Sequence, residues 1–270
     1  MDHLSIDYWD RVSTVKQRDA AAPDYDFFGI PFGTPGFGIE EPVHTHPNTV
    51  LVLSAERQAR MNLTNREIHR LMPRDRKIRF SVDVRSFLDA DIPEEDILLL
   101  ICDARKVAEV FTGQRLGITF VYTSTPGHEV FSIRCGRTLA KGILAQFFFP
   151  SDLPRDRQVL VSSSLMYSAY RFGNLSKIRR VLAHEFTHIL GFRHWHAGSD
   201  DGEKEAPSKL WPGTTDDDRN TIMCTPYHSL LNFHEEDFRV IREVYSVRNG
   251  HMLDDCVVID VDPYARRFIS

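Results

Sequence analysis

The chain has 270 residues, of which 42% are hydrophobic and 26% charged, a balance typical of globular proteins and not of disordered or fibrous ones. Its 33 basic and 38 acidic residues give a net charge of −5, and no basic cluster indicates nucleic acid or an anionic membrane as a partner. The longest apolar runs are far shorter than the roughly 20 residues of a spanning helix, so we expect no transmembrane segment.

Residues 1–75 are irregular, with Gly and Pro clustered in FFGIPFGTPGFGIEEP. We expect an N-terminal extension that acts as a pro-segment or as an arm wrapping the main domain. The first ten residues contain acids and lack the basic start and apolar core of a secretory signal, so the sequence shows no signal peptide.

From residue 76 the pattern becomes orderly. Residues 77–84, KIRFSVDV, alternate as a half-buried strand does. Pro93 and three following acids then indicate the start of a helix, which Gly113 ends. The apolar face of this helix consists of Ile97, Ile101, Ala104, Ala108 and Phe111.

Four β-rich stretches follow within residues 118–161, namely ITFVYT, EVFSIRC, ILAQFFF and QVLVSSS. A second helix is expected over 176–190, then a long polar loop, and a last helical pattern in FHEEDFRVIREVYS. This succession predicts an α+β fold with a catalytic domain over residues 76–250 and a C-terminal tail over 251–270.

The segment HEFTHILGFRH carries the chemistry. His184 and His188 lie four residues apart on a predicted helix, so both imidazoles face one side and can share one zinc ion. Glu185 would lie beside the metal and take a proton from a bound water. Gly191 permits a left-handed turn that brings up His194 as a third ligand. Three protein ligands and an open fourth position are typical of a catalytic zinc site.

The histidines of this segment have other interpretations. A short HExxH pattern often occurs by accident, whereas a match at five fixed positions rarely does. His196 competes with His194 for the third position, but the Gly-x-x-His spacing favours His194. A purely structural zinc site would need a fourth protein ligand, and His196 and Cys224 lack the usual spacing.

The long histidine motif, followed by Met223 in TIMCTPYH, resembles the metzincin clan of zinc peptidases over residues 76–248. The resemblance implies an α+β fold with a five-stranded mixed sheet, a backing helix, a zinc-binding active-site helix, a Met-turn at Met223 and a C-terminal helix. It implies one catalytic Zn²⁺ held by His184, His188 and His194. It also implies zinc-dependent endopeptidase activity, with Glu185 as general base.

Within the clan the chain is most similar to the matrixins. GILAQFFFP resembles the matrixin strand beside the cleft, whose backbone pairs with an extended substrate, and Leu144 and Ala145 match its Leu-Ala. Trp195 departs from the matrixin pattern, which has Ser after the third histidine. Tyr227 could bind the zinc or an oxyanion through its hydroxyl, line the substrate pocket, or pack in the core.

Two further patterns have plain alternatives. Cys135 lies in an RCG sequence that resembles the matrixin cysteine switch, but it is too close to His184, and we interpret it as a strand residue. His44 and His46 could cover the zinc or could be exposed loop histidines. The four cysteines allow two disulfides or four thiols.

The resemblance favours secretion, a protein or peptide substrate and a monomeric state. It also allows a structural Ca²⁺, for which no residue pattern argues. The main rival hypothesis is a catalytically silent metzincin-shaped protein that binds zinc and peptides. The intact Glu185 favours the enzyme, because a protein without catalytic demand could lose that residue freely.

Overall fold

The strand and the helix that the sequence predicts after residue 76 are both present in the structure. A computed structural model describes residues 60–125, 127–137, 139, 143–194, 208–212, 221–223 and 235–264. The predicted strand forms β3 (Lys77–Val82), and its alternate side chains are buried. The predicted helix forms α3 (Glu94–Gly113), whose first turn carries the three acids that stabilise a helix N-terminus.

The main sheet has five strands in the order β4-β3-β5-β7-β6. All neighbours pair in parallel except β6, which is antiparallel to β7 and lies at the edge. The α+β class and the five-stranded mixed sheet predicted from the sequence are therefore confirmed. The strands after β3 are β4 (Thr119–Tyr122), β5 (Phe131–Cys135), β6 (Ala145–Gln146) and β7 (Gln158–Val161).

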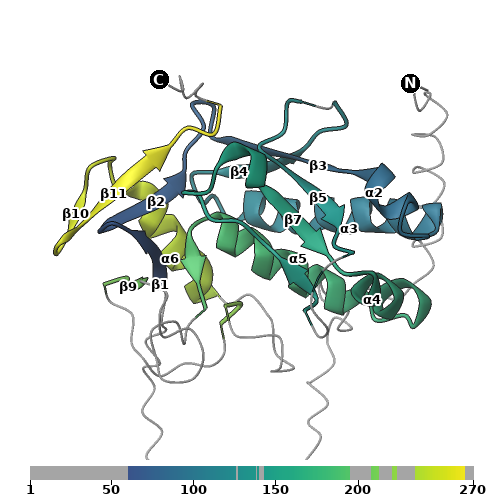
Figure 1. The fold of residues 1–270 in the computed structure, drawn as a ribbon. Coiled ribbons are helices and arrows are strands. Elements are labelled where there is room, and N and C mark those ends of the chain that lie inside the picture. The colour runs from purple at the N-terminus through teal and green to yellow at the C-terminus, as the bar shows by residue number, and fades with distance from the viewer. Residues whose placement is uncertain are drawn as a thin grey trace, which may run out of the picture. The chain divides into compact units, whose positions relative to one another are not determined.

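Two helices cover one face of this sheet, α3 and α5 (Leu175–Ile189) (Figure 1). A cluster of buried phenylalanines joins the layers. The ring of Phe186 on α5 lies 4.7 Å from that of Phe120 and 5.3 Å from that of Phe80, both on the sheet. Phe111 on α3 contacts Phe120 at 5.2 Å. Aromatic burial therefore fixes how α5 sits on the sheet.

The last two strands are shorter than the sequence predicts. ILAQFFF pairs only at β6, and QVLVSSS ends at Val161. The strand β7 ends at Val161 because Ser162 begins a helix. The Ser162 hydroxyl accepts a hydrogen bond from the backbone N–H of Leu165 at 3.2 Å and caps that helix. The short helices that the sequence did not predict are α2 (Val84–Leu88), η1 (Pro154–Asp156), α4 (Ser163–Met166) and η2 (Tyr167–Arg171).

A second, six-stranded sheet has the order β10-β11-β2-β1-β8, and β9 also pairs with β1. Its strands are β1 (Arg60–Thr64), β2 (Glu67–Leu71), β8 (Phe192–Arg193), β9 (Ser208–Leu210), β10 (Met252–Leu253) and β11 (Cys256–Val261). Residues from both sides of the expected 76–250 domain therefore share one sheet with strands from within it, and this sheet was not predicted.

The second sheet is fastened to α6 (Glu235–Ser246) by a buried arginine. Arg70 on β2 is 1% exposed, and its Nε donates to Asp260 on β11 at 2.6 Å. Its other nitrogens donate to the backbone oxygens of Val244 and Val247, the latter at 2.7 Å. Those oxygens lie at the C-terminal end of α6, where a helix presents unpaired carbonyls and attracts a cation.

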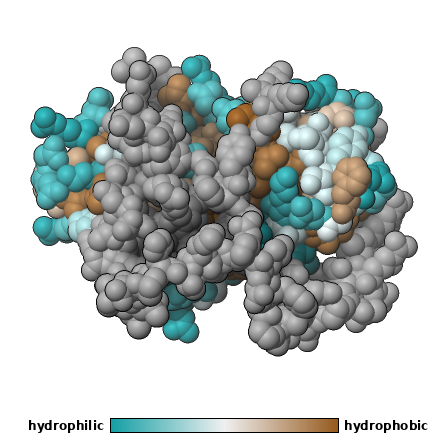
Figure 2. Space-filling view, turned by 90° about the horizontal axis from the view of Figure 1, so that it is seen from below, coloured by the Kyte–Doolittle hydropathy of each residue, from teal (hydrophilic) through white to brown (hydrophobic). Residues whose placement is uncertain are grey.

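The described surface is mixed in polarity. Figure 2 shows apolar residues among hydrophilic ones on the face seen from below. Large hydrophobic side chains at the surface include Phe172, which is 83% exposed, and Tyr167 and Leu175. Within the described parts of the chain, no helix is both long and apolar enough to cross a membrane.

Candidate metal centre

The last two turns of α5 carry the first part of the candidate site. His184 and His188 share one face, while Phe186 lies two residues from each and so points to the opposite side, into the phenylalanine cluster. All residues from Val181 to Gly191 are buried. The helix is therefore held on one side by the core while it presents two imidazoles on the other.

Gly191 turns the chain sharply after α5. Its φ is +101°, which residues with a Cβ rarely adopt, and its N–H donates to the carbonyl of His188 at 2.8 Å. The chain then enters β8, which pairs antiparallel with β1. His194 follows β8 directly, and the turn at Gly191 brings it close to His184 and His188 on α5. The conformation predicted at Gly191 from the motif is thus present.

The three histidines meet at their Nε2 atoms. The Nε2 atoms of His184 and His188 are 3.0 Å apart, those of His184 and His194 are 3.1 Å apart, and those of His188 and His194 are 3.2 Å apart. Among the described residues, these are the only three histidine, cysteine or acidic side chains grouped as metal ligands could be. The structure therefore brings together the three residues that the sequence singled out.

Backbone carbonyls determine the protonation of two of these rings. Nδ1 of His184 lies 2.6 Å from the oxygen of Ile222, and Nδ1 of His188 lies 2.7 Å from that of Phe192. A carbonyl oxygen only accepts, so each Nδ1 carries the hydrogen and each neutral ring has a bare lone pair at Nε2. Burial, together with the neighbouring histidines, lowers the pKa of His188 well below its usual value, which favours this neutral form.

Converging lone pairs repel one another unless a cation lies between them. A zinc ion binds imidazole nitrogen at about 2.0–2.1 Å, and tetrahedral geometry then separates two ligand nitrogens by about 3.3–3.4 Å. The observed separations of 3.0–3.2 Å differ from this by a few tenths of an ångström. Histidines that bind zinc usually donate their second N–H to a carbonyl or carboxylate, as His184 and His188 do here. The residues present fit a divalent metal ion that prefers nitrogen ligands.

Glu185 lies next to the first histidine and is 5% exposed. Its Oε2 atom is buried and has no hydrogen-bond partner among the described residues. Burial raises the pKa of its carboxyl to about 8. An acid that is buried without a partner costs free energy, and such groups gather at sites that use them in binding or catalysis.

Met223 belongs to a buried segment that supports His184. The carbonyl of Ile222 accepts the Nδ1 proton of His184, and Met223 itself is 4% exposed. Asp237 on α6 holds the segment by accepting from the Thr221 hydroxyl at 2.5 Å and from the Ile222 N–H at 3.4 Å. The carbonyl that orients the first histidine is thus fixed by a carboxylate on a different helix.

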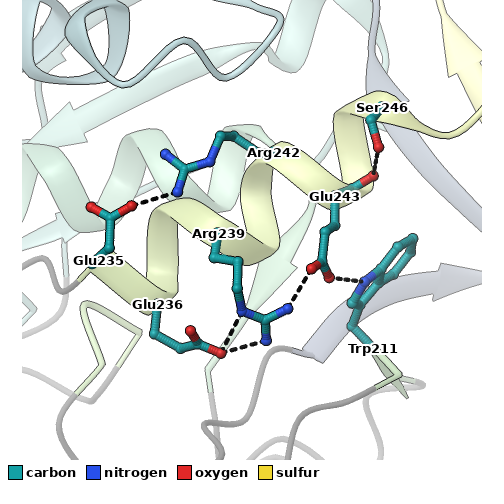
Figure 3. A network of polar contacts seen from close by, with 7 residues as sticks. All are labelled: Trp211, Glu235, Glu236, Arg239, Arg242, Glu243 and Ser246. Carbon is teal, nitrogen blue, oxygen red and sulfur yellow. Dashed lines mark hydrogen bonds and ion pairs between the residues drawn. The ribbon is translucent and has the colours of Figure 1, made fainter.

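A second group of contacts connects the segment that follows β9 to α6 (Figure 3). Trp211, which follows β9, donates from Nε1 to Glu243 at 3.3 Å. Arg239 bridges Glu243 and Glu236 on the same helix, with an Nε–Oε1 distance of 2.8 Å to Glu236. Two separate segments, around residues 211 and 222, are therefore anchored on α6.

Aromatic residues after β6 lie against the second histidine. The ring of Phe147 stacks on His188 with centroids 3.5 Å apart and planes at 10°, and Phe149 meets it edge-on at 6.0 Å. Of the two residues expected to hold substrate, Ala145 begins the edge strand β6 and Leu144 directly precedes it, and Phe147 follows the end of that strand. The sheet edge and the three histidines are thus neighbours.

The backbone of Ala145 faces away from the sheet. Leu144 accepts from the N–H of Ser162 at 2.9 Å, and Ala145 pairs with Val161 in register. Hydrogen-bonding positions alternate along an antiparallel pair. It follows that Leu144 and Gln146 direct their backbone groups toward β7, while those of Ala145 point away from β7, to a side on which no described strand pairs with β6.

Several predicted residues lie outside the described parts of the chain, namely Tyr227, Trp195, His196, Cys224, His44 and His46. Cys135 is described as the last residue of β5 and is a strand residue as interpreted. Phe147 and the carbonyls of Ile222 and Phe192 contact the histidines but were not predicted from the sequence. The alternation of Phe147 and Phe149 could have indicated that these two rings face the same side. The role of a backbone carbonyl cannot be read from side chains.

A scan against models of known protein families finds no match, and a search of curated proteins finds no similar sequence.

Proposed function

We propose that the protein is a zinc-dependent endopeptidase with a metzincin-like catalytic domain. The observation that carries the proposal is the triangle of the His184, His188 and His194 Nε2 atoms, which lie 3.0–3.2 Å apart. Glu185, next to His184 in the sequence, has a buried carboxylate oxygen with no hydrogen-bond partner among the described residues. Three nitrogen ligands leave a fourth position for water or substrate, as catalytic zinc sites do.

The protein's own groups have separate roles in the proposed reaction. When bound, zinc would lower the pKa of a coordinated water to near 7 and polarise the substrate carbonyl. Glu185 accepts the proton of the attacking water and returns it to the leaving amine, so peptide hydrolysis proceeds without a covalent enzyme intermediate. A nearby cation favours the ionised carboxylate, which offsets the effect of burial on the pKa of Glu185.

The edge strand β6 is the proposed docking place for the substrate backbone. The N–H and C=O of Ala145, which pair with no described strand, can pair with an extended peptide, which adds a strand to the sheet. Phe147 follows it and stacks on His188, so a peptide bound to β6 would run beside the histidines. This proximity favours a peptide substrate over a small molecule. Tyr227 is kept as a proposed pocket or oxyanion residue.

Metal content and cleavage of a peptide library test the proposal together. Wild-type protein should hold about one zinc per chain and cleave quenched fluorescent peptides, and a chelator should stop the cleavage. His188→Ala should lose most of the zinc and the activity, because it removes one of three ligands. His128→Ala is the matched control, since His128 is exposed and lies outside the cluster.

The outcomes separate the rival hypotheses. A wild-type protein without zinc, or a His188→Ala variant with full zinc, would refute the metal site. Zinc-loaded protein that binds peptides and cleaves none would favour the catalytically silent binding protein.

A further inference from the structure

The third histidine is the one ligand that α5 does not hold. His194 lies beyond Gly191 and directly after β8, a strand of two residues. A strand this short is not stable by itself, so its position depends on what it pairs with. β8 pairs with β1, where Arg60 lies opposite Arg193 and Met61 opposite Phe192.

Asn62 contacts this segment at two points. Its backbone N–H donates to the carbonyl of Gly191 at 2.8 Å. Its side-chain Oδ1 accepts from Nη1 of Arg193 at 3.0 Å, and the residue is only 7% exposed. Asn62 on β1 thus contacts the chain on both sides of Phe192, at Gly191 and at Arg193, and Arg193 directly precedes His194.

Met61 and Arg193, which lie beside the contacts of Asn62, are themselves packed against other parts of the site. Met61 is fully buried and its Cε lies 3.2 Å from where a Cβ on Gly191 would be. The guanidinium of Arg193 also lies 5.1 Å above the ring of Phe149, which meets His188 edge-on. Arg193 is therefore held between β1 and the aromatic residues that follow β6.

We propose that Asn62 is a positioning residue for the metal centre. It fixes residues 191–193 so that Nε2 of His194 stays within reach of the two histidines on α5. This inference rests on the proposed metal binding. It implies that β1 belongs to the scaffold of the site and is not a removable pro-segment, so any maturation cleavage that leaves the metal bound falls before residue 60.

Zinc affinity and stability, measured separately, test the role of Asn62. The full chain is compared with Asn62→Ala and Asn62→Asp, using competition with a chromophoric chelator for the zinc dissociation constant and urea unfolding of the metal-free protein. Partners that orient metal ligands are typically worth about 10- to 100-fold in affinity, so Asn62→Ala should raise the dissociation constant about tenfold. Asn62→Asp keeps an acceptor for Arg193 and should stay close to wild type.

Thr64→Ala is the matched control, because Thr64 lies on β1 but pairs with β2 and not with β8. It should leave zinc affinity unchanged. If Asn62→Ala does not fold, Arg193→Met removes the same hydrogen bond from the other side and should weaken zinc binding equally. Wild-type affinity in the folded variant, even with lower stability, would overturn the proposal.

Limited proteolysis of the zinc-loaded full chain tests the implied cleavage limit. Every fragment that keeps one zinc should retain residues 60–71 when its mass is measured, and a zinc-bearing species without them would contradict the inference. Zinc-free wild-type protein would instead refute the proposed function, and a zinc-bearing wild type with unaffected variants would refute the role of Asn62 alone.

Discussion

Gly191 forms the turn that connects α5, with His184 and His188, to His194. A Cβ at this position would lie 2.8 Å from the backbone oxygen of His69 and 3.2 Å from Met61 Cε, and the φ of +101° already disfavours any side chain. Backbone and side chain both argue for glycine here. The sequence motif places the glycine correctly, but only the structure shows that β1 and β2 make the site too close for a Cβ.

We predict that Gly191→Ala destabilises the protein and weakens zinc binding. Forcing alanine into this conformation costs about 1–3 kcal/mol, and the contact with His69 adds to that cost. Urea unfolding of the metal-free protein measures the loss. Gly113→Ala is the control, since no atom lies within 4 Å of the added Cβ and it should change stability little. Equal stability of the two variants would show that the turn tolerates a side chain.

At the level of elements, the long helices were predictable, whereas the short helices and the ends of the strands were not. α3 begins and ends where its acids and Gly113 indicate, because these signals are local. α5 likewise covers the expected stretch, and its Phe186 packs against phenylalanines of the sheet. β6 and β7 are shorter than their apolar runs because pairing partners and the Ser162 cap, not hydrophobicity, decide where they end.

The open edge of β6 gives a prediction about substrate binding. Ala145→Pro removes the N–H that faces away from β7 while leaving the pairing groups of Leu144 and Gln146 in place. We expect KM to rise several-fold or cleavage to stop, with zinc content unchanged. Peptide kinetics and metal analysis measure the two effects.

Ala145→Val serves as the control, because it adds bulk and keeps the N–H. If both variants lose activity equally, the side chain and not the backbone contacts the substrate. If neither does, the substrate binds elsewhere.

For the whole molecule, the second sheet is the part that sequence patterns did not reveal. β2 and β11 pair in parallel although they lie at opposite ends of the described chain, with His69 against Ile259. Such pairing has no local signal, since it depends on which distant strand is available. Buried Arg70 gave no signal either, because arginine is usually a surface residue.

Arg70 should be important for the stability of the whole domain. Arg70→Met leaves Asp260, which is partly exposed, and two backbone carbonyls at the end of α6 without their donor, and an acceptor left unsatisfied in a buried place costs about 1–3 kcal/mol. The free energy of unfolding in urea measures this. Arg85→Met removes an exposed pair with Asp89 and should change it by about 0.5 kcal/mol or less. Similar losses for both would mean that Arg70 does not join the sheet to α6.

The most direct test of the peptidase hypothesis compares zinc-loaded wild type with zinc-loaded Glu185→Gln on one good peptide substrate. Glutamine preserves the shape of the buried side chain and removes the base. General acid–base catalysis is typically worth about 10²- to 10⁴-fold, so kcat should fall by at least about 100-fold while zinc content and KM change little. Equal cleavage rates for the two zinc-loaded proteins would contradict the mechanism.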